Sequence, residues 1–258
     1  NEQTKKVLSK HQYIIIEHDF KVARSNNPAL YPNMIVPEDQ IQNKDFFQNA
    51  KAVLCQSKLH AETVQKNLLL KNVHNLSCNI WSDEHIQLLE ENLNKTKTRK
   101  FGILDSTNKN KGTPQTIDYC RKNNIQYELI SACSQKEFYK ELTKTETIVF
   151  MPTWLESFSR VAVEARILGC KLITNKAIGC ASEPYFSLKG KELLDKIKQK
   201  RSDVFNSIVE IIEGNDPMLL EPIKPIQVPK VSVIMTFYKA LEHIKGCMET
   251  FVNQTIFN

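Results

Sequence analysis

Residues 147–174 read TIVFMPTWLESFSRVAVEARILGCKLIT, and this stretch decides the fold class. It opens with an apolar run, passes through a short loop, continues with apolar residues at helical spacing, and closes on a second apolar run after Gly169. Continuous apolar runs suit strands that are buried on both faces, as in parallel sheets. The order strand, helix, strand therefore predicts a unit of an α/β domain.

The same alternation continues on both sides of this stretch. Strands are expected at residues 13–17, 52–56, 72–76, 100–104, 126–130, 147–151, 171–174 and 231–235. Helices are expected at residues 59–70, 83–93, 114–123, 135–142, 158–168 and 202–213. Such alternation predicts parallel sheets covered by helices and disfavours an antiparallel sandwich.

The composition is that of an ordinary globular protein. In a chain of 258 residues, 41% hydrophobic residues suffice for one large core or two modest ones. The seven cysteines are an odd number, spread singly, which favours free thiols in a reducing cytoplasm over disulfides or a zinc site. No apolar run approaches the ~20 residues of a membrane span, and no signal peptide is visible. We therefore expect a cytoplasmic protein without a transmembrane segment, for which peripheral membrane association stays open.

The charge gives only a weak indication of anionic partners. The 35 basic residues exceed the 29 acidic ones by 6, and the lysines are dispersed. Between residues 95 and 111 the chain carries several basic residues and a single acidic one, Asp105. Most of these basic residues are expected on a solvated surface. Basic and aromatic residues do not interleave, so nucleic-acid binding is not expected.

A ligand site is expected where the strand at 147–151 runs into the next helix. Unpaired backbone N–H groups and the positive end of the helix dipole meet there, and small serines leave those groups open to a diphosphate. Glu156 and Glu164 bracket this turn about 80° apart around the helix axis, so both can face one cleft and bind the hydroxyls of two sugar rings. In the alternative interpretation, Glu164 pairs with Arg160 on a solvated face and Glu156 only favours the helix start.

Residues 151–184, MPTWLESFSRVAVEARILGCKLITNKAIGCASEP, resemble the signature of family 4 glycosyltransferases, enzymes of GT-B fold. The resemblance implies that Glu156 lies near the donor sugar and that Glu164 binds the ribose. It also includes a glycine loop that closes on Glu183, which is likewise expected at the donor. Three residues stand where typical members carry Gly-Phe-Gly and are expected at the donor: Ser157, Phe158 and Ser159.

A second element of this resemblance lies upstream. Family members usually show Gly-Arg after the first strand of this domain and Lys-Gly shortly afterwards, and the two cations bind the diphosphate. Here Gly102 is followed by Ile103, whereas Lys111 and Gly112 match the second pair. Lys109 or Arg160 is expected to supply the missing charge.

The N-terminal part resembles the same family more loosely. Residues 13–20, YIIIEHDF, resemble the strand that faces the cleft from the N-terminal domain, and residues 50–57 resemble its next strand. His18 is therefore a candidate for a contact across the cleft, although a lone histidine at a strand end also fits a purely structural hydrogen bond. The family's opening strands are not found, so this domain is expected to be incomplete.

The prolines at 217–229 predict a linker between domains. After it, residues 228–238 together with 253–255 resemble the opening of family 2 glycosyltransferases of GT-A fold, although the first strand of any α/β domain reads similarly. The expected division is a partial N-terminal Rossmann-like domain on the acceptor side (1–79), a C-terminal nucleotide-sugar-binding Rossmann-like domain (80–224), and a linker with the truncated start of a GT-A-like domain (225–258).

Together these features predict a glycosyltransferase, and the resemblance implies that it is hexosyltransferase-like and retains the anomeric configuration of the sugar. A sugar would pass from a nucleoside diphosphate sugar to a glycan or lipid-linked acceptor, in the synthesis of surface polysaccharide or glycoconjugate. No metal and no cofactor other than the donor are expected, and Glu156, His18 and Lys111 are the candidate catalytic residues. Two alternatives stay open: a sugar-nucleotide epimerase of the same architecture, and a module that binds nucleotide sugars without turnover.

Overall fold

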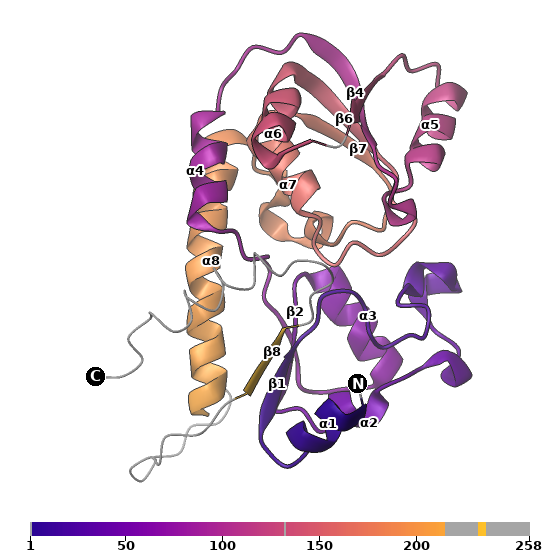
Figure 1. Ribbon diagram of the computed structural model, residues 1–258, viewed down its shortest axis with the longest axis vertical. Coiled ribbons are helices and arrows are strands. Elements are labelled where there is room, and N and C mark those ends of the chain that lie inside the picture. Colours follow the sequence, from indigo (N-terminus) through magenta and orange to yellow (C-terminus); the bar gives the residue numbers. More distant parts are fainter. Residues whose placement is uncertain (1, 132, 215–231, 236–258) are drawn as a thin grey trace.

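The protein is built on two parallel sheets (Figure 1). The structure, a computed structural model, describes residues 2–131, 133–214 and 232–235. The strand order is β3-β2-β1-β8 in the first sheet and β5-β4-β6-β7 in the second. We call the parts built on these sheets the N-terminal unit and the C-terminal unit. All pairings are parallel, which confirms the predicted α/β class with two Rossmann-like sheets.

The N-terminal unit forms where the sequence alternates between buried strands and amphipathic helices. Its strands are β1 (Tyr13–Ile16), β2 (Ala52–Cys55), β3 (Val73–Asn75) and β8 (Ser232–Met235), and its helices are α1 (Glu2–Leu8), α2 (Lys44–Gln48) and α3 (Lys58–Leu68). Every residue of β2 is fully buried, as expected for a central strand of a parallel sheet. Ser57 caps α3 by accepting a hydrogen bond from the backbone N–H of His60.

The C-terminal unit repeats this design. Its strands are β4 (Arg99–Asp105), β5 (Glu128–Ser131), β6 (Thr145–Phe150) and β7 (Lys171–Thr174), and its helices are α4 (Asp83–Glu91), α5 (Thr113–Lys122), α6 (Gln135–Lys144), α7 (Arg160–Ile167) and α8 (Gly190–Glu213). In β6, Ile148 and Phe150 belong to the main core, whereas Val149 packs with Ile103 in the core on the other face. Burial on both faces explains the continuous apolar run.

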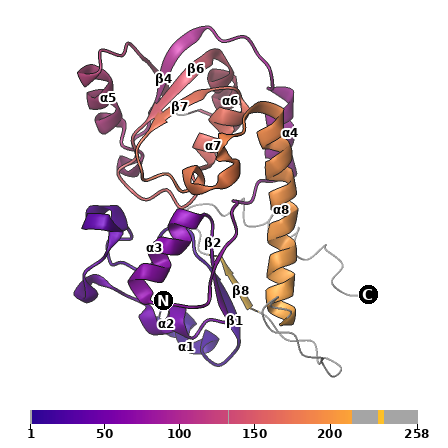
Figure 2. The same cartoon turned by 180° about the vertical axis from the view of Figure 1, so that it is seen from behind.

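The long helix α8 joins the two units. It packs against α4 and α7 and continues along the N-terminal unit, where Lys51 Nζ donates to the carbonyl of Ile212 at 3.0 Å (Figures 1 and 2). Its apolar stripe consists of Leu193, Leu194, Ile197, Val204 and Ile208. The predicted helix at 202–213 is therefore only the second half of a 24-residue helix.

Two of the basic residues between 95 and 111 are structural rather than part of a solvated surface. Lys97 Nζ donates to the carbonyls of Leu142 (3.1 Å) and Leu168 (2.6 Å), at the ends of α6 and α7. The last carbonyls of a helix lack partners within it, so a lysine stabilises them. Arg99 pairs with Glu128 and Glu141.

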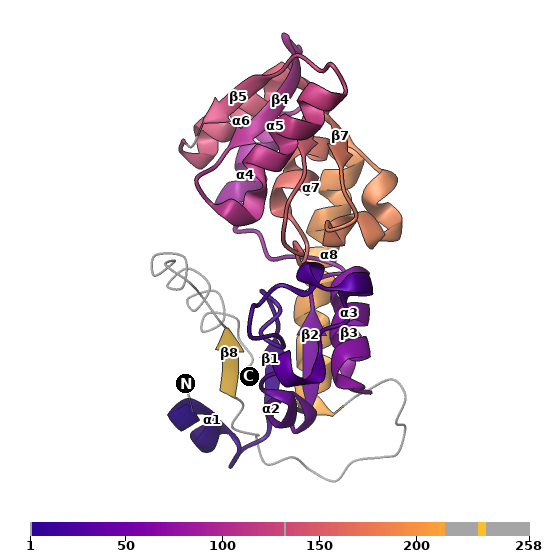
Figure 3. The ribbon, with the colours of Figure 1, turned by 90° about the vertical axis from the view of Figure 1, so that its right-hand side faces the viewer.

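The predicted strand at 231–235 forms as β8, but it pairs with β1 in the N-terminal sheet (Figure 3). An apolar run indicates burial without indicating which sheet edge it joins. The linker prolines at 217–229 and everything after Met235 lie outside the described residues, so the three-part division stays a prediction. Among the helices that the structure describes, none is long and apolar enough to cross a membrane.

Candidate functional site

The loop between β6 and α7 is held by the glycine loop that follows β7. The backbone N–H of Glu156 donates to the carbonyl of Ala177. The N–H of Gly179 donates to the carbonyl of Glu156, and that of Cys180 to the carbonyl of Phe158, each at 2.8 Å. Gly179 allows this approach, because a Cβ there would lie 2.2 Å from the carbonyl oxygen of Ser157. The predicted site loop is therefore a fixed turn at the carboxyl edge of the second sheet.

Ser159 stands at the N-cap of α7 in an unusual conformation. Its φ of 71° and ψ of 84° lie in the left-handed region, which favours the glycine that the family resemblance places here. Its side chain does not cap the helix, and its buried Oγ has no hydrogen-bond partner among the described residues. Because buried hydroxyls are almost always hydrogen-bonded, this oxygen indicates a place for a water or a ligand.

Lys111 and Glu156, predicted from separate motifs, meet in the structure. Lys111 Nζ lies 2.8 Å from Glu156 Oε1 and 3.1 Å from Oε2. The 3₁₀ turn Lys109–Lys111 reaches this place because Gly112 (φ 65°) approaches Met151 so closely that a Cβ would lie 2.0 Å from its carbonyl oxygen. Thr153 N–H also donates to the carbonyl of Asn110 at 3.1 Å, which fixes the same loop.

The other expected cations are exposed. Lys109 lies on the same 3₁₀ turn as Lys111, and Arg160 is the first residue of α7. Ile103, at the position where the family carries arginine, is fully buried with Cys120, Val149 and Met151 under α5. Ile103 therefore serves the core, and a diphosphate contact from Lys109 or Arg160 stays a prediction.

Glu164 is 3% exposed, and its Oε1 accepts a hydrogen bond from the indole N–H of Trp81 at 3.2 Å. Burial raises the pKa of Glu164 above its ordinary value, while the charge of Arg160 and the Trp81 bond oppose that rise. No ion pair within the described residues joins it to Arg160, so the solvated-face alternative is wrong. Its contact with a ribose stays a prediction.

Tyr139 of α6 lies beside Glu164, and its hydroxyl is buried in the same region. Burial raises its pKa, and the negative charge of Glu164 raises it further. A carboxylate and a phenol thus share one buried region under α7.

The two units contact each other directly at the predicted cleft. Ser57 Oγ donates to the carbonyl of Ser157 at 2.6 Å, and Ser157 Oγ donates to Gln56 Oε1 at 3.2 Å. Ser57 and Gln56 follow β2 and Ser157 follows β6, so the carboxyl edges of the two sheets face each other. The crevice beside Ser157 is closed by protein in this arrangement.

Glu183 lies at the centre of this contact. It is 4% exposed, and its carboxylate accepts hydrogen bonds from Lys58 N–H (2.7 Å), Asn75 Nδ2 (3.1 Å) and Ser77 Oγ. All three donors belong to the N-terminal unit or its exit. The structure therefore gives Glu183 a contact between units, and its predicted role at the donor is untested.

His18 is half-exposed and its Nδ1 lies 2.7 Å from Asp19 Oδ1. This hydrogen bond lowers the pKa of Asp19 to about 2. Sequence reasoning missed two buried neighbours of this segment: Glu17, whose pKa burial raises to about 7, and His60, whose pKa burial lowers to about 3. The apolar strand before Glu17 was the available signal, since it places a carboxyl group at a buried strand end.

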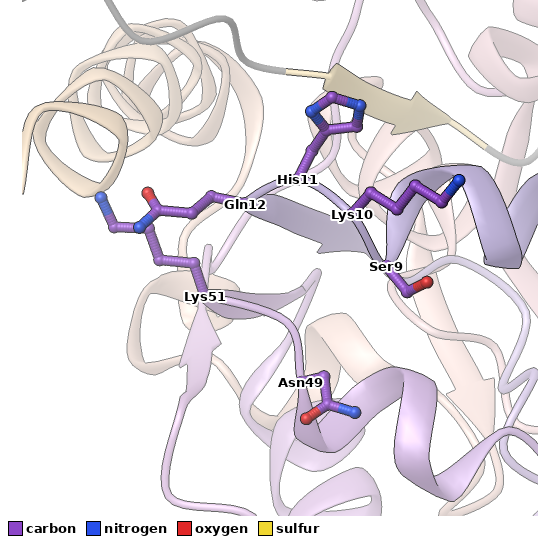
Figure 4. Close-up of a pocket in the computed structure, with 6 residues that line it drawn as sticks. All are labelled: Ser9, Lys10, His11, Gln12, Asn49 and Lys51. Carbon is purple, nitrogen blue, oxygen red and sulfur yellow. The ribbon is translucent and has the colours of Figure 1, made fainter.

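A hollow of about 470 Å³ lies away from these residues, at the amino end of β1 (Figure 4). Its lining consists of Ser9, Lys10, His11, Gln12, Asn49 and Lys51. Lys51 already donates to the end of α8, so at least part of this basic lining stabilises the fold. The predicted donor site and this hollow lie at opposite edges of the first sheet.

Comparison with known proteins gives little beyond this geometry. No protein-family model matches the sequence, and no curated protein does. Among solved structures, the chain is similar to the crystal structure of Anabaena Alr3699/HepE in complex with UDP and glucose. That likeness has 16% sequence identity and a TM-score of 0.37, and it covers 84% of this chain and 74% of that one. Values this low do not transfer a function.

Proposed function

We propose that this protein is a glycosyltransferase that binds a nucleoside diphosphate sugar at the N-terminal turn of α7. One observation carries the proposal: a lysine, two carboxylates and a buried serine hydroxyl without a partner among the described residues lie around one helix start at the carboxyl edge of a parallel sheet. Helix starts at that edge bind anionic ligands through their free N–H groups.

Each group has a role in this proposal. When the donor binds, Lys111 exchanges its hydrogen bond to Glu156 for one to a phosphate oxygen. Its positive charge then stabilises the diphosphate, both in the bound donor and as the leaving group. Glu156 then becomes free to accept hydrogen bonds from the transferred sugar. Glu164 accepts hydrogen bonds from the ribose hydroxyls, and a carboxylate suits this because it accepts two at once.

The closed crevice sets a condition on this mechanism. Ser57 and Gln56 bond to Ser157 directly, so a donor reaches the turn only after the two units separate. We therefore expect an opening motion before binding, of the hinge type common in two-domain enzymes.

Calorimetric titration with UDP, GDP and ADP tests the proposal. We expect one of them to bind the wild-type protein, and Glu164→Gln to weaken binding by about 1–3 kcal/mol, because ribose hydroxyls lose a charged acceptor. Glu146→Gln, on the exposed face of β6, is the matched control and should bind as the wild type does. Absence of binding to every nucleotide, or equal affinity for Glu164→Gln, contradicts the proposal.

A product assay separates the enzyme classes. With a nucleoside diphosphate sugar, a transferase needs an acceptor to release nucleotide at its full rate. An epimerase would give an isomerised sugar or free nucleotide without any acceptor. Binding without turnover in both conditions would indicate a non-catalytic module, in line with the missing arginine at Ile103.

A further inference from the structure

Trp81 lies on the connector between β3 of the N-terminal unit and α4 of the C-terminal unit. It is fully buried, in a core that includes Ile14 and Leu54 from one unit and Phe158 and Ala162 from the other. A residue on the connector that packs among both units changes its surroundings whenever the units move relative to each other.

Two contacts link Trp81 to the proposed donor site. Its indole N–H donates to Glu164 Oε1 at 3.2 Å. Its ring packs edge-on against Phe158, with centroids 5.9 Å apart and planes at 75°. Phe158 belongs to the turn before α7 and Glu164 to the second turn of that helix, so Trp81 contacts the site at both places.

The bonding around Glu164 is unusual for a purely structural residue. A buried carboxylate costs free energy unless several donors satisfy it. The nearby Oγ of Ser159, at the N-cap of the same helix, is buried without a partner among the described residues. An apolar side chain would fill this place at lower cost. A buried carboxylate that the Trp81 N–H helps to orient, beside a serine oxygen that lacks a partner among the described residues, therefore indicates a site that a hydroxyl-bearing ligand completes.

We propose that Trp81 is a positioning residue: its indole N–H orients the Glu164 carboxylate for the ribose hydroxyls of the donor and thereby ties donor binding to the arrangement of the two units. This inference rests on the proposed function. Because Trp81 belongs to the connector, a change in the angle between the units would move the orienting N–H away from Glu164. The donor site is then complete only in one arrangement of the units.

The test removes the N–H and keeps the ring. In a Trp154→Phe background, which leaves Trp81 as the single tryptophan of the chain, Trp81 is replaced by benzothienylalanine, in which sulfur stands for the N–H. A Trp81→Phe variant is made in parallel. Both proteins are titrated with the nucleoside diphosphate that the wild type binds. Compared with the Trp154→Phe protein, the benzothienylalanine protein and the Trp81→Phe variant should each bind it about 3- to 10-fold more weakly, which is the effect of losing one hydrogen bond.

Two further measurements distinguish positioning from packing. If Trp81 acts through Glu164, Trp81→Phe should change the affinity no further in a Glu164→Gln background. Tyr13→Phe removes a partly buried hydrogen bond from the Tyr13 hydroxyl to the carbonyl of Phe46 (2.6 Å) in the N-terminal unit and should lower thermal stability without changing affinity.

The outcomes separate the two proposals. If the wild type binds no nucleotide, the proposed function fails and the positioning role fails with it. Two results would overturn only the role of Trp81 while the wild type binds nucleotide. In one, the benzothienylalanine protein binds as tightly as the Trp154→Phe protein; in the other, Trp81→Phe and Glu164→Gln weaken binding independently. Reduced stability with unchanged affinity, as expected for Tyr13→Phe, would likewise make Trp81 a packing residue.

Discussion

The ammonium group of Lys111 lies 2.8 Å from Glu156 Oε1, so the cation expected to bind the diphosphate is paired with the carboxylate expected near the donor sugar. Glu156 is largely buried and Lys111 is about one-third exposed. The pair keeps both charges compensated while no ligand is bound. Phosphate oxygens can replace Glu156 as the partner of Lys111, because charged hydrogen bonds to either acceptor are of similar strength.

Lys111→Met should weaken nucleoside diphosphate binding by about 1.5–3 kcal/mol, since a charged hydrogen bond to phosphate is lost while the side-chain volume is kept. Calorimetry at two salt concentrations measures this, and the remaining affinity should depend less on salt than in the wild type. Lys122→Met removes an exposed pair with Asp118 at the other end of α5 and serves as the control. Equal affinity of Lys111→Met and the wild type would contradict the role of Lys111.

Ser159→Gly should stabilise the protein by about 1 kcal/mol, because glycine adopts the positive φ of this position without strain. Ser159→Val should destabilise it by a similar amount or more, since a β-branched residue is disfavoured there. Urea unfolding measures both.

Ser157→Gly provides the contrast to Ser159→Gly. Ser157 has no positive φ, and its Oγ donates to Gln56, so loss of the side chain should destabilise the protein. If Ser159→Gly and Ser157→Gly change stability in the same direction, the strain at Ser159 is not relieved by glycine.

Glu17→Gln should change the pH dependence of stability. Burial raises the pKa of Glu17 from 4.5 to about 7, so the folded state holds this proton more tightly than the unfolded state. The contribution of protonated Glu17 to the free energy of unfolding is fully present below pH 4.5 and is lost as the pH rises to about 7. At 1.36 kcal/mol per unit, the wild type loses about 3 kcal/mol relative to Glu17→Gln over this window.

Urea unfolding of both proteins between pH 4 and pH 8 measures the difference, in which all other titrating groups cancel. Glutamine keeps an oxygen that can accept the hydrogen bond from Lys21 N–H. Glu62→Gln, at a half-exposed position on α3, is expected to show no such dependence. A constant difference between Glu17→Gln and the wild type would show that Glu17 titrates normally.

The sequence predicted most elements because their patterns are local. The strand at 171–174 was predicted to the residue, and α4 begins at the predicted Asp83. Lys111 and Glu156 could be placed at one site because each follows a strand of the same sheet, and carboxyl ends of parallel strands meet at one edge.

What the sequence could not predict depends on contacts between distant segments. Nothing local to Trp81 indicates that its indole reaches Glu164, which is 83 positions away. Glu183 follows a glycine loop that resembles a donor-binding motif, yet its hydrogen-bond donors come from the other unit. The edge that β8 joins is likewise set by the free side of β1, which an apolar run cannot specify.

Glu183→Ala should loosen the contact between the two units. Three donors, Lys58 N–H, Asn75 Nδ2 and Ser77 Oγ, lose the acceptor that they share in partly buried hydrogen bonds, which should cost about 2 kcal/mol. The donor at Lys58 is especially sensitive, because it belongs to the first turn of α3, where an anion is favourable. Small-angle scattering should show a larger radius of gyration than for the wild type, and thermal unfolding should begin at a lower temperature.

Opening of the crevice should also change donor access in Glu183→Ala. If the contact between units limits entry, the variant should bind nucleoside diphosphate with a faster association rate than the wild type, which stopped-flow tryptophan fluorescence can follow. Glu62→Ala, also on α3 but half-exposed and only loosely paired with Lys58 and Lys66 at 4.0 and 3.8 Å, should change neither the radius of gyration nor the rate. An unchanged radius of gyration together with an unchanged association rate would mean that the remaining contacts, such as Ser57 with Ser157, hold the units closed without Glu183.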